Sequence, residues 1–115
     1  MSDVTIWHNP RCSKSRQTLA LIEERGIAPT VRRYLDDAPS EAEIRATLAA
    51  LGLKPIEAMR TKEKEFKEMG LSRDSDDDTL IRAMAEAPKL IERPIVFAGG
   101  KARLGRPPEQ VLEIF

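Results

Sequence analysis

The stretch VTIWHNPRCSKSRQTLALIEERG, residues 4–26, decides the fold. Its first four residues alternate β-branched apolar with other side chains, which predicts a short strand that stops before His-Asn-Pro. Helical spacing of apolar residues then runs from about Ser13 to Arg25, and Gly26 stands where a left-handed cap residue is expected. A second strand is predicted over residues 30–35. We therefore expect a β-α-β unit with parallel strands and a right-handed crossover.

The middle of the chain predicts helices only. Ser40 and Glu43 form a Ser-x-x-Glu capping box, which opens a helix of about three turns that stops at Gly52. Short helical pieces are predicted over residues 55–70, and one more helix before Pro88. This region is interpreted as a helical insert over about residues 40–87.

The C-terminal region predicts a β-hairpin and a last helix. Residues 95–97 and 101–104 flank Gly99-Gly100, which supplies the positive φ of a tight turn. The prolines after Arg106 are typical of the first turn of a helix. The order β-α-β, helical insert, β-β-α is that of the thioredoxin-like α/β fold with a small mixed sheet. We predict a single domain over residues 1–115.

Composition limits the function classes. The chain has 115 residues with one Cys, one His and 19 basic against 19 acidic side chains. One Cys precludes an internal disulfide and multi-Cys zinc sites, so the expected compartment is the cytoplasm. Zero net charge argues against nucleic-acid binding, and no apolar run approaches a secretory signal or the about 20 residues of a membrane span. The acidic run at residues 74–78 is expected to open a helix rather than bind a metal, because it lacks the spacing of a calcium loop.

Positive charge is concentrated at both ends of the chain. No acidic residue stands between Asp3 and Glu23 or between Glu92 and Glu109, whereas both stretches carry several Lys and Arg residues. Residues 23–92 hold 12 basic and 16 acidic side chains, a net charge of −4. If the fold brings the two ends together, they form a site for a small anion.

Cys12 is the candidate nucleophile. It lies in a polar turn at the predicted start of a helix, close to Arg11, Lys14 and Arg16, and such surroundings favour a thiolate. Lowering a thiol pKa from about 8.5 to about 6.5 needs roughly 2.7 kcal/mol. A helix terminus supplies at most about 2 kcal/mol, so the cations and a donor such as Ser15 Oγ must supply the rest.

Three other residues are candidates for the same site. His8 either tunes Cys12 or is a strand-end histidine with a satisfied hydrogen bond. The motif is Cys-x-x-Ser, so the second thiol of a redox cycle must come from another molecule. Arg93 and Arg106 each precede a proline, which restricts their backbone, and the planar guanidinium group suits a tetrahedral oxyanion.

Four motifs carry a family resemblance, namely residues 8–16, Arg60, residues 92–96 and residues 106–112. Together they resemble the glutaredoxin-linked arsenate reductase family, ArsC, and particularly its short YfgD-like members. The likeness extends over about residues 3–114. It implies a thioredoxin-like fold and the reduction of arsenate to arsenite in the cytoplasm. Glutathione and glutaredoxin would be the electron donors, with no cofactor bound.

The same resemblance implies roles for individual residues. Cys12 would be the nucleophile, and His8 and Ser15 would stabilise its thiolate. The oxyanion would be bound by three arginines, Arg60, Arg93 and Arg106. Pro94 would be the cis-proline that faces the active site in this fold.

Two other functions are open. One is a redox-responsive transcriptional regulator of the Spx kind, which has a similar fold and binds RNA polymerase, but typically uses a Cys pair. The other is a glutathione-dependent thiol oxidoreductase that acts on protein disulfides. No glycine fingerprint for a flavin or nicotinamide is present, and no metal, nucleic acid or membrane partner is expected. The expected state is a monomer.

Overall fold

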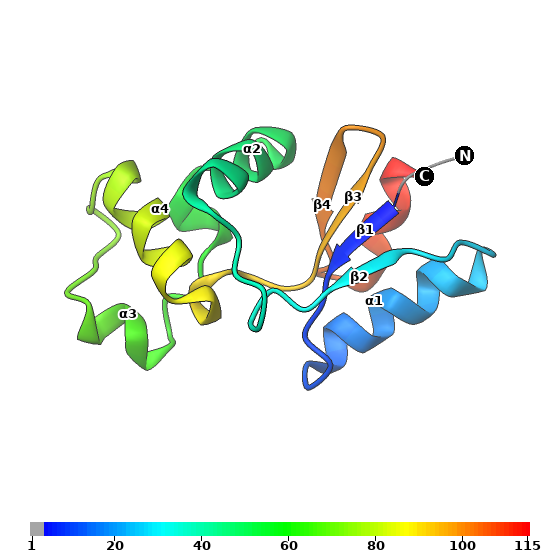
Figure 1. Ribbon diagram of the computed structural model, residues 1–115, viewed down its shortest axis with the longest axis horizontal. Helices are drawn as coiled ribbons and strands as arrows, with labels where there is room; N and C mark the ends of the chain where they lie inside the picture. The colour runs from blue at the N-terminus through cyan, green and yellow to red at the C-terminus, as the bar shows by residue number, and fades with distance from the viewer. Residues whose placement is uncertain (1–3) are drawn as a thin grey trace. The chain divides into compact units, whose positions relative to one another are not determined.

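The computed structural model describes residues 4–115 (Figure 1). They form two compact units. The sheet unit contains the residues up to Asp37 together with Arg93–Phe115, and the helical unit is Ala38–Glu92. Within residues 4–115 no helix combines the length and the apolar character that crossing a membrane requires.

The sheet unit contains one four-stranded mixed sheet of order β2-β1-β3-β4. Helix α1, Ser13–Glu24, connects two parallel strands, whereas the other two pairs of strands are antiparallel. The predicted parallel β-α-β unit and the predicted hairpin are thereby confirmed. The strands are β1 (Val4–Trp7), β2 (Thr30–Arg32), β3 (Ile95–Ala98) and β4 (Lys101–Leu104).

The register of the strands explains why distant segments meet. Trp7, the last residue of β1, is paired with Arg32 at the end of β2 and with Ile95 at the start of β3. Ile95 is in turn paired with Leu104, the last residue of β4. The segments that follow β1, β2 and β4, and the one that precedes β3, therefore lie at one end of the sheet, here called the site end.

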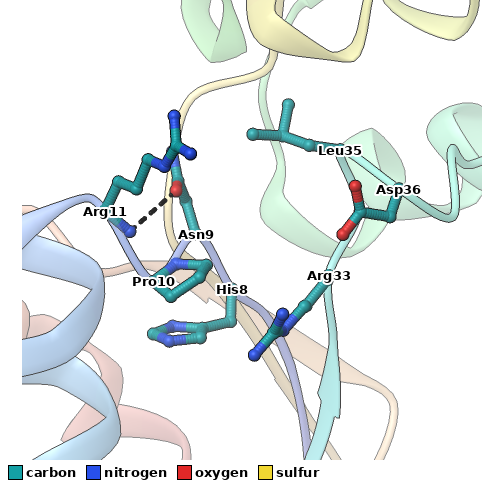
Figure 2. A pocket seen from close by; sticks show the side chains of 7 residues that line it. All are labelled: His8, Asn9, Pro10, Arg11, Arg33, Leu35 and Asp36. Carbon is teal, nitrogen blue, oxygen red and sulfur yellow. Dashed lines mark hydrogen bonds between the residues drawn. The ribbon is translucent and has the colours of Figure 1, made fainter.

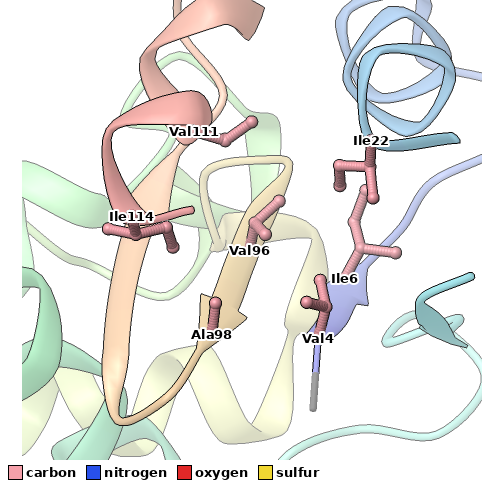
Figure 3. Close-up of a cluster of buried hydrophobic side chains, with 7 residues drawn as sticks. All are labelled: Val4, Ile6, Ile22, Val96, Ala98, Val111 and Ile114. Atoms are coloured by element: carbon pink, nitrogen blue, oxygen red, sulfur yellow. The ribbon is translucent and has the colours of Figure 1, made fainter. Parts of the chain in front are cut away.

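One face of the sheet carries the main hydrophobic core. Helix α1 and the C-terminal segment η3, Pro108–Ile114, pack on this face (Figure 3). Ile6, Ile22, Val96 and Val111 are completely buried there. Burial of side chains of this size stabilises a fold by about 1.5–3 kcal/mol each. The buried residues of the cluster are Val4, Ile6, Ile22, Val96, Ala98, Val111 and Ile114.

Two sequence predictions about the sheet unit need correction. The second strand was expected over residues 30–35, but β2 ends at Arg32, because the amides of Asp36 and Asp37 turn back to the carbonyl oxygen of Arg33. The last helix is η3, a 3₁₀ helix, rather than an α-helix. Its start contains prolines, which lack the amide hydrogens of a normal helical ladder, and such short segments often take the tighter form.

The helical unit follows the predicted order of short helices. The capping box is present: the Glu43 amide donates to Ser40 Oγ (3.1 Å) and the Ser40 amide donates to Glu43 Oε1 (3.0 Å). Asp76 caps α4 by accepting a 2.7 Å hydrogen bond from the Thr79 amide, so the acidic run opens a helix. The elements are α2 (Glu41–Leu51), η1 (Pro55–Ala58), α3 (Lys64–Glu68), α4 (Asp77–Glu86) and η2 (Pro88–Leu90).

Candidate active site

Cys12 lies at the site end of the sheet, where it is the N-cap residue of α1. The loop that precedes it is held by its own hydrogen bonds. The Cys12 amide donates to the Asn9 carbonyl oxygen (3.0 Å), the Arg11 amide donates to Asn9 Oδ1 (3.0 Å), and Arg16 Nη1 donates to the Pro10 carbonyl oxygen (2.9 Å). Cys12 is only 8% exposed, which is more buried than its polar neighbours suggest. The sulfur is therefore fixed in position and largely shielded from water.

The surroundings of Cys12 favour its thiolate. Burial raises the pKa of the thiol, but this effect is outweighed by the Ser15 amide, by the hydrogen bond and charge of Arg93, and by the Lys14 amide, so the pKa is lowered. The predicted convergence of the positively charged ends is confirmed here, because Arg93 comes from the far part of the sequence. Ser15 acts on the thiol through its backbone amide, whereas a contribution from Ser15 Oγ stays a prediction.

Arg93 and Arg106 are linked to each other at the start of β3 and the end of β4. Arg106 Nε donates a 2.9 Å hydrogen bond to the carbonyl oxygen of Arg93. The Arg93–Pro94 peptide bond is cis, and the Pro94 carbonyl oxygen accepts a 2.9 Å hydrogen bond from the Gly105 amide. Arg93 is half-buried and Arg106 is exposed. Arg93, which acts on the Cys12 thiol, is thus linked through its backbone carbonyl oxygen to the side chain of Arg106.

His8 and Ser15 form a buried hydrogen-bonded pair. His8 Nδ1 and Ser15 Oγ share a 2.6 Å hydrogen bond, and the Asn9 amide donates to the same oxygen at 3.0 Å. Burial, followed by the charges of Arg33 and Arg16, lowers the pKa of His8 below its ordinary value, so the imidazole is neutral at pH 7. His8 therefore has the satisfied hydrogen bond that the sequence analysis expected of a strand-end histidine. The hydrogen bond to Ser15 also connects His8 to the first turn of α1, whose amides act on the Cys12 thiol.

Arg60 belongs to the helical unit, where carboxylates surround its guanidinium group. Nε lies 3.0 Å from Glu63 Oε1 and Nη1 lies 3.3 Å from Glu92 Oε1. Its amide donates to the Leu90 carbonyl oxygen (2.7 Å), which fixes the backbone as well. The role of Arg60 in binding an oxyanion stays a prediction. Among the described residues, no group of His, Cys, Asp and Glu side chains is arranged to hold a metal ion.

A hollow of about 330 Å³ opens at the site end, between the loop after β1 and the segment after β2 (Figure 2). Figure 2 shows the Arg33 side chain extending from the β2 side towards His8. The sequence prediction did not single out either Arg33, which it placed in a strand over residues 30–35, or Asp36, which directly follows that strand. The residues that line the hollow are His8, Asn9, Pro10, Arg11, Arg33, Leu35 and Asp36.

Comparison with known proteins identifies the family. The model of the ArsC family matches residues 7–114. The chain is 54% identical to the uncharacterized protein YfgD of Escherichia coli over 96% of its own length and 95% of that relative. It is 50% identical to an arsenate reductase of Neisseria meningitidis, with coverage of 96% and 97%. The solved structure of an arsenate reductase from Vibrio cholerae superposes with a TM-score of 0.94 at 56% identity, over 98% of both chains, which confirms the thioredoxin-like fold. With a Cys12 thiol whose pKa is lowered in part by Arg93, and with a family match over nearly its whole length, this chain belongs to the ArsC family.

Proposed function

We propose that this protein is an arsenate reductase that uses glutathione and glutaredoxin as electron donors. The observation that carries the proposal is that Arg93, at the site end of the sheet, lowers the pKa of the Cys12 thiol through its side-chain hydrogen bonding and its charge. An oxyanion bound to that guanidinium group lies next to a thiol whose pKa is lowered. The arsenate reductases of Neisseria meningitidis and Vibrio cholerae, at 50% and 56% identity, support the choice of substrate.

Three arginines share the binding of the tetrahedral anion in this proposal. Arg93 holds the anion at the sulfur, and Arg106 adds a second guanidinium group whose Nε is tied to the Arg93 carbonyl oxygen. Arg60 contributes the third, positioned on its own unit by Glu63 and Glu92. Within the sheet unit, Arg93 and Arg106 are linked before the substrate arrives, and such fixed positive groups stabilise charge as it redistributes over the arsenate oxygens.

The reduction of arsenate proceeds in two steps, which leave a mixed disulfide between Cys12 and glutathione. The Cys12 thiolate attacks arsenic, a sulfur–arsenic bond forms, and one oxygen leaves as water after protonation. The thiolate of glutathione then attacks the Cys12 sulfur, the sulfur–arsenic bond breaks, and its electron pair reduces arsenic(V) to arsenic(III). Arsenite is released, and the mixed disulfide between Cys12 and glutathione is reduced by glutaredoxin. A cytoplasmic location, where thiols stay reduced, belongs to this proposal.

The test is oxidation of NADPH that depends on arsenate, measured with glutathione, glutaredoxin and glutathione reductase. We expect turnover by the wild-type protein and none by Cys12→Ser. Arg60→Ala, Arg93→Ala and Arg106→Ala are each expected to raise the arsenate concentration needed for half-maximal rate. The absence of turnover by the wild-type protein over a wide range of arsenate concentrations rejects the proposed function.

A further inference from the structure

Glutathione needs a binding site, here called the seat, from which its sulfur reaches Cys12, because the described chain has a single thiol. We infer that the hollow lined by Arg11, Arg33 and Asp36 is this seat, and that it recognises the charged ends of glutathione. The inference rests on the proposed function, which names glutathione as the donor of the second thiol.

The charges of the hollow complement those of glutathione. The tripeptide has two carboxylates, one ammonium group and a thiol, which gives a net charge of −1 near pH 7. The hollow presents the guanidinium groups of Arg11 and Arg33, the carboxylate of Asp36 and a neutral His8, which gives a net charge of +1. Guanidinium groups bind carboxylates by paired hydrogen bonds, and the Asp36 carboxylate offers an acceptor for the ammonium group. The carboxylates and the ammonium group of glutathione therefore each find a group of opposite charge in the hollow.

The polar groups of the hollow are available for a ligand. Arg11, Arg33 and Asp36 are all exposed. Among residues 4–115 the side chains of Arg33 and Asp36 have no hydrogen bond or ion pair, although the charge of Arg33 acts on His8. By contrast, Arg32, one residue earlier, is 3.3 Å from Asp37 Oδ2 and stacks on Trp7 with 5.5 Å to the ring centroid.

Size and distance also fit. Small-molecule sites have volumes of about 300–1,000 Å³, and the hollow has about 330 Å³. Arg11 lines the hollow and is bonded directly to Cys12, so their Cα atoms are about 3.8 Å apart. An extended tripeptide spans about 10 Å. The hollow therefore lies next to the residue that carries the sulfur, and the proposal places the central cysteine of glutathione at Cys12 with the charged ends of the tripeptide in the hollow.

The experiment does not need arsenate. Reduced protein is mixed with oxidised glutathione, and the rate of the mixed disulfide on Cys12 is followed by mass spectrometry. In this reaction the Cys12 thiolate forms a bond to one sulfur of oxidised glutathione, the disulfide of the reagent breaks, and a glutathione thiolate leaves. The reference reagent is bis(2-hydroxyethyl) disulfide, which is uncharged and undergoes the same exchange.

We expect Arg33→Ala to slow the reaction with oxidised glutathione about five- to tenfold, because a charge-assisted hydrogen bond is lost at an exposed site. The rate with the uncharged disulfide is expected to stay within about twofold, since the sulfur itself is unchanged. Arg25→Ala is the matched control, because Arg25 is an exposed arginine at the far end of α1. It is expected to leave both rates within about twofold.

Asp36→Asn separates recognition from general attraction. If net charge alone governs the rate, loss of this carboxylate speeds the reaction with anionic oxidised glutathione. If Asp36 binds the ammonium group of glutathione, the same change slows it. We expect the slower reaction, and a faster or unchanged reaction overturns the inference.

The outcomes for the two proposals are distinct. Equal losses with both disulfides for Arg33→Ala indicate an effect on the Cys12 thiolate and overturn the seat. Selective losses in a protein that shows no turnover of arsenate retain the glutathione seat and reject only arsenate as the substrate. Turnover of arsenate with unchanged rates in the Arg33 and Asp36 variants retains the proposed function and rejects the seat.

Discussion

Gly105 lies against Pro94 with no room for a side chain. Its amide donates a 2.9 Å hydrogen bond to the Pro94 carbonyl oxygen. A Cβ atom built on Gly105 would lie 2.6 Å from Pro94 Cγ and 2.5 Å from Thr18 Oγ1. Gly105 therefore connects α1, through Thr18, to the segment that carries Arg93.

We predict that Gly105→Ala destabilises the protein by about 1–3 kcal/mol, the usual cost of an added methyl group in a well-packed site. The variant is also expected to need more arsenate, because a shifted Pro94 displaces Arg93 from the Cys12 sulfur. Urea denaturation and the coupled assay measure the two effects.

A double-variant cycle tests the cause of this loss. Thr18→Ala removes the hydroxyl group at 2.5 Å, so the loss in Thr18→Ala/Gly105→Ala should be smaller than the sum of the single losses. Additive losses within about 0.5 kcal/mol contradict the proposed steric cause.

The pKa of the Cys12 thiol provides a second prediction. Since Arg93 lowers this pKa by a hydrogen bond and by its charge, Arg93→Ala is expected to raise it. The rate of alkylation by iodoacetamide follows the thiolate fraction, so the pH profile of the variant should move to higher pH.

Arg103→Ala is the matched control for that shift. Arg103 lies in β4 and is 3.1 Å from Glu113 Oε1, and it is not among the groups that act on the Cys12 thiol. Its alkylation profile should coincide with that of the wild-type protein. Superimposable profiles for Arg93→Ala and the wild type would show that the thiolate is stabilised without Arg93.

Local signals in the sequence were sufficient for most elements. Gly26 adopts a positive φ of 78° after α1, and Gly99 and Gly100 have φ values of 56° and 81° in the hairpin turn. Each of these features depends on a few neighbouring residues, so its signal is complete within a short stretch of sequence. The same holds for the capping box of Ser40 and Glu43.

The capping box yields a prediction for stability alone. Ser40→Ala removes the acceptor of the Glu43 amide and is expected to cost about 1 kcal/mol of unfolding free energy. Ser13→Ala, an exposed serine at the start of α1, is the control and should change stability by less than about 0.5 kcal/mol. Equal changes in the two variants, measured by urea denaturation, contradict the capping role.

The site was predicted only in part, because its contacts depend on register and on chain direction. The concentration of positive charge in both end segments suggested an anion site on the condition that the fold brings them together, and the family resemblance placed Arg93 and Cys12 in that site. They did not reveal which atom of Ser15 acts on the sulfur, because that depends on the backbone geometry of the first turn of α1. Arg33 was missed because the sequence pattern placed it inside a strand. In the structure β2 ends at Arg32, and because β1 and β2 are parallel, Arg33 lies at the site end beside the loop that follows β1.

The buried His8 gives a prediction for the pH dependence of stability. Its pKa is lowered in the folded protein, so at pH values below about 6.5, the ordinary pKa, the unfolded chain binds the proton more readily. The free energy of unfolding should therefore fall as the pH decreases from 6.5 towards the pKa of the folded state. At neutral pH and above, this contribution is fully present.

His8→Gln isolates this effect, because glutamine does not titrate and still offers polar atoms towards Ser15 Oγ. The difference in stability between pH 7.5 and pH 5, measured by urea denaturation, is expected to be smaller in the variant than in the wild-type protein. Asp76→Asn changes a carboxylate whose pKa is lowered by the Thr79 amide and side chain, and which titrates in a more acidic range, so it should retain the wild-type difference. An equal difference in wild type and His8→Gln would mean that His8 takes up its proton as readily in the folded protein as in the unfolded chain. The buried hydrogen bond to Ser15 would then tolerate a charged ring, contrary to its burial and to the positive charges of Arg33 and Arg16.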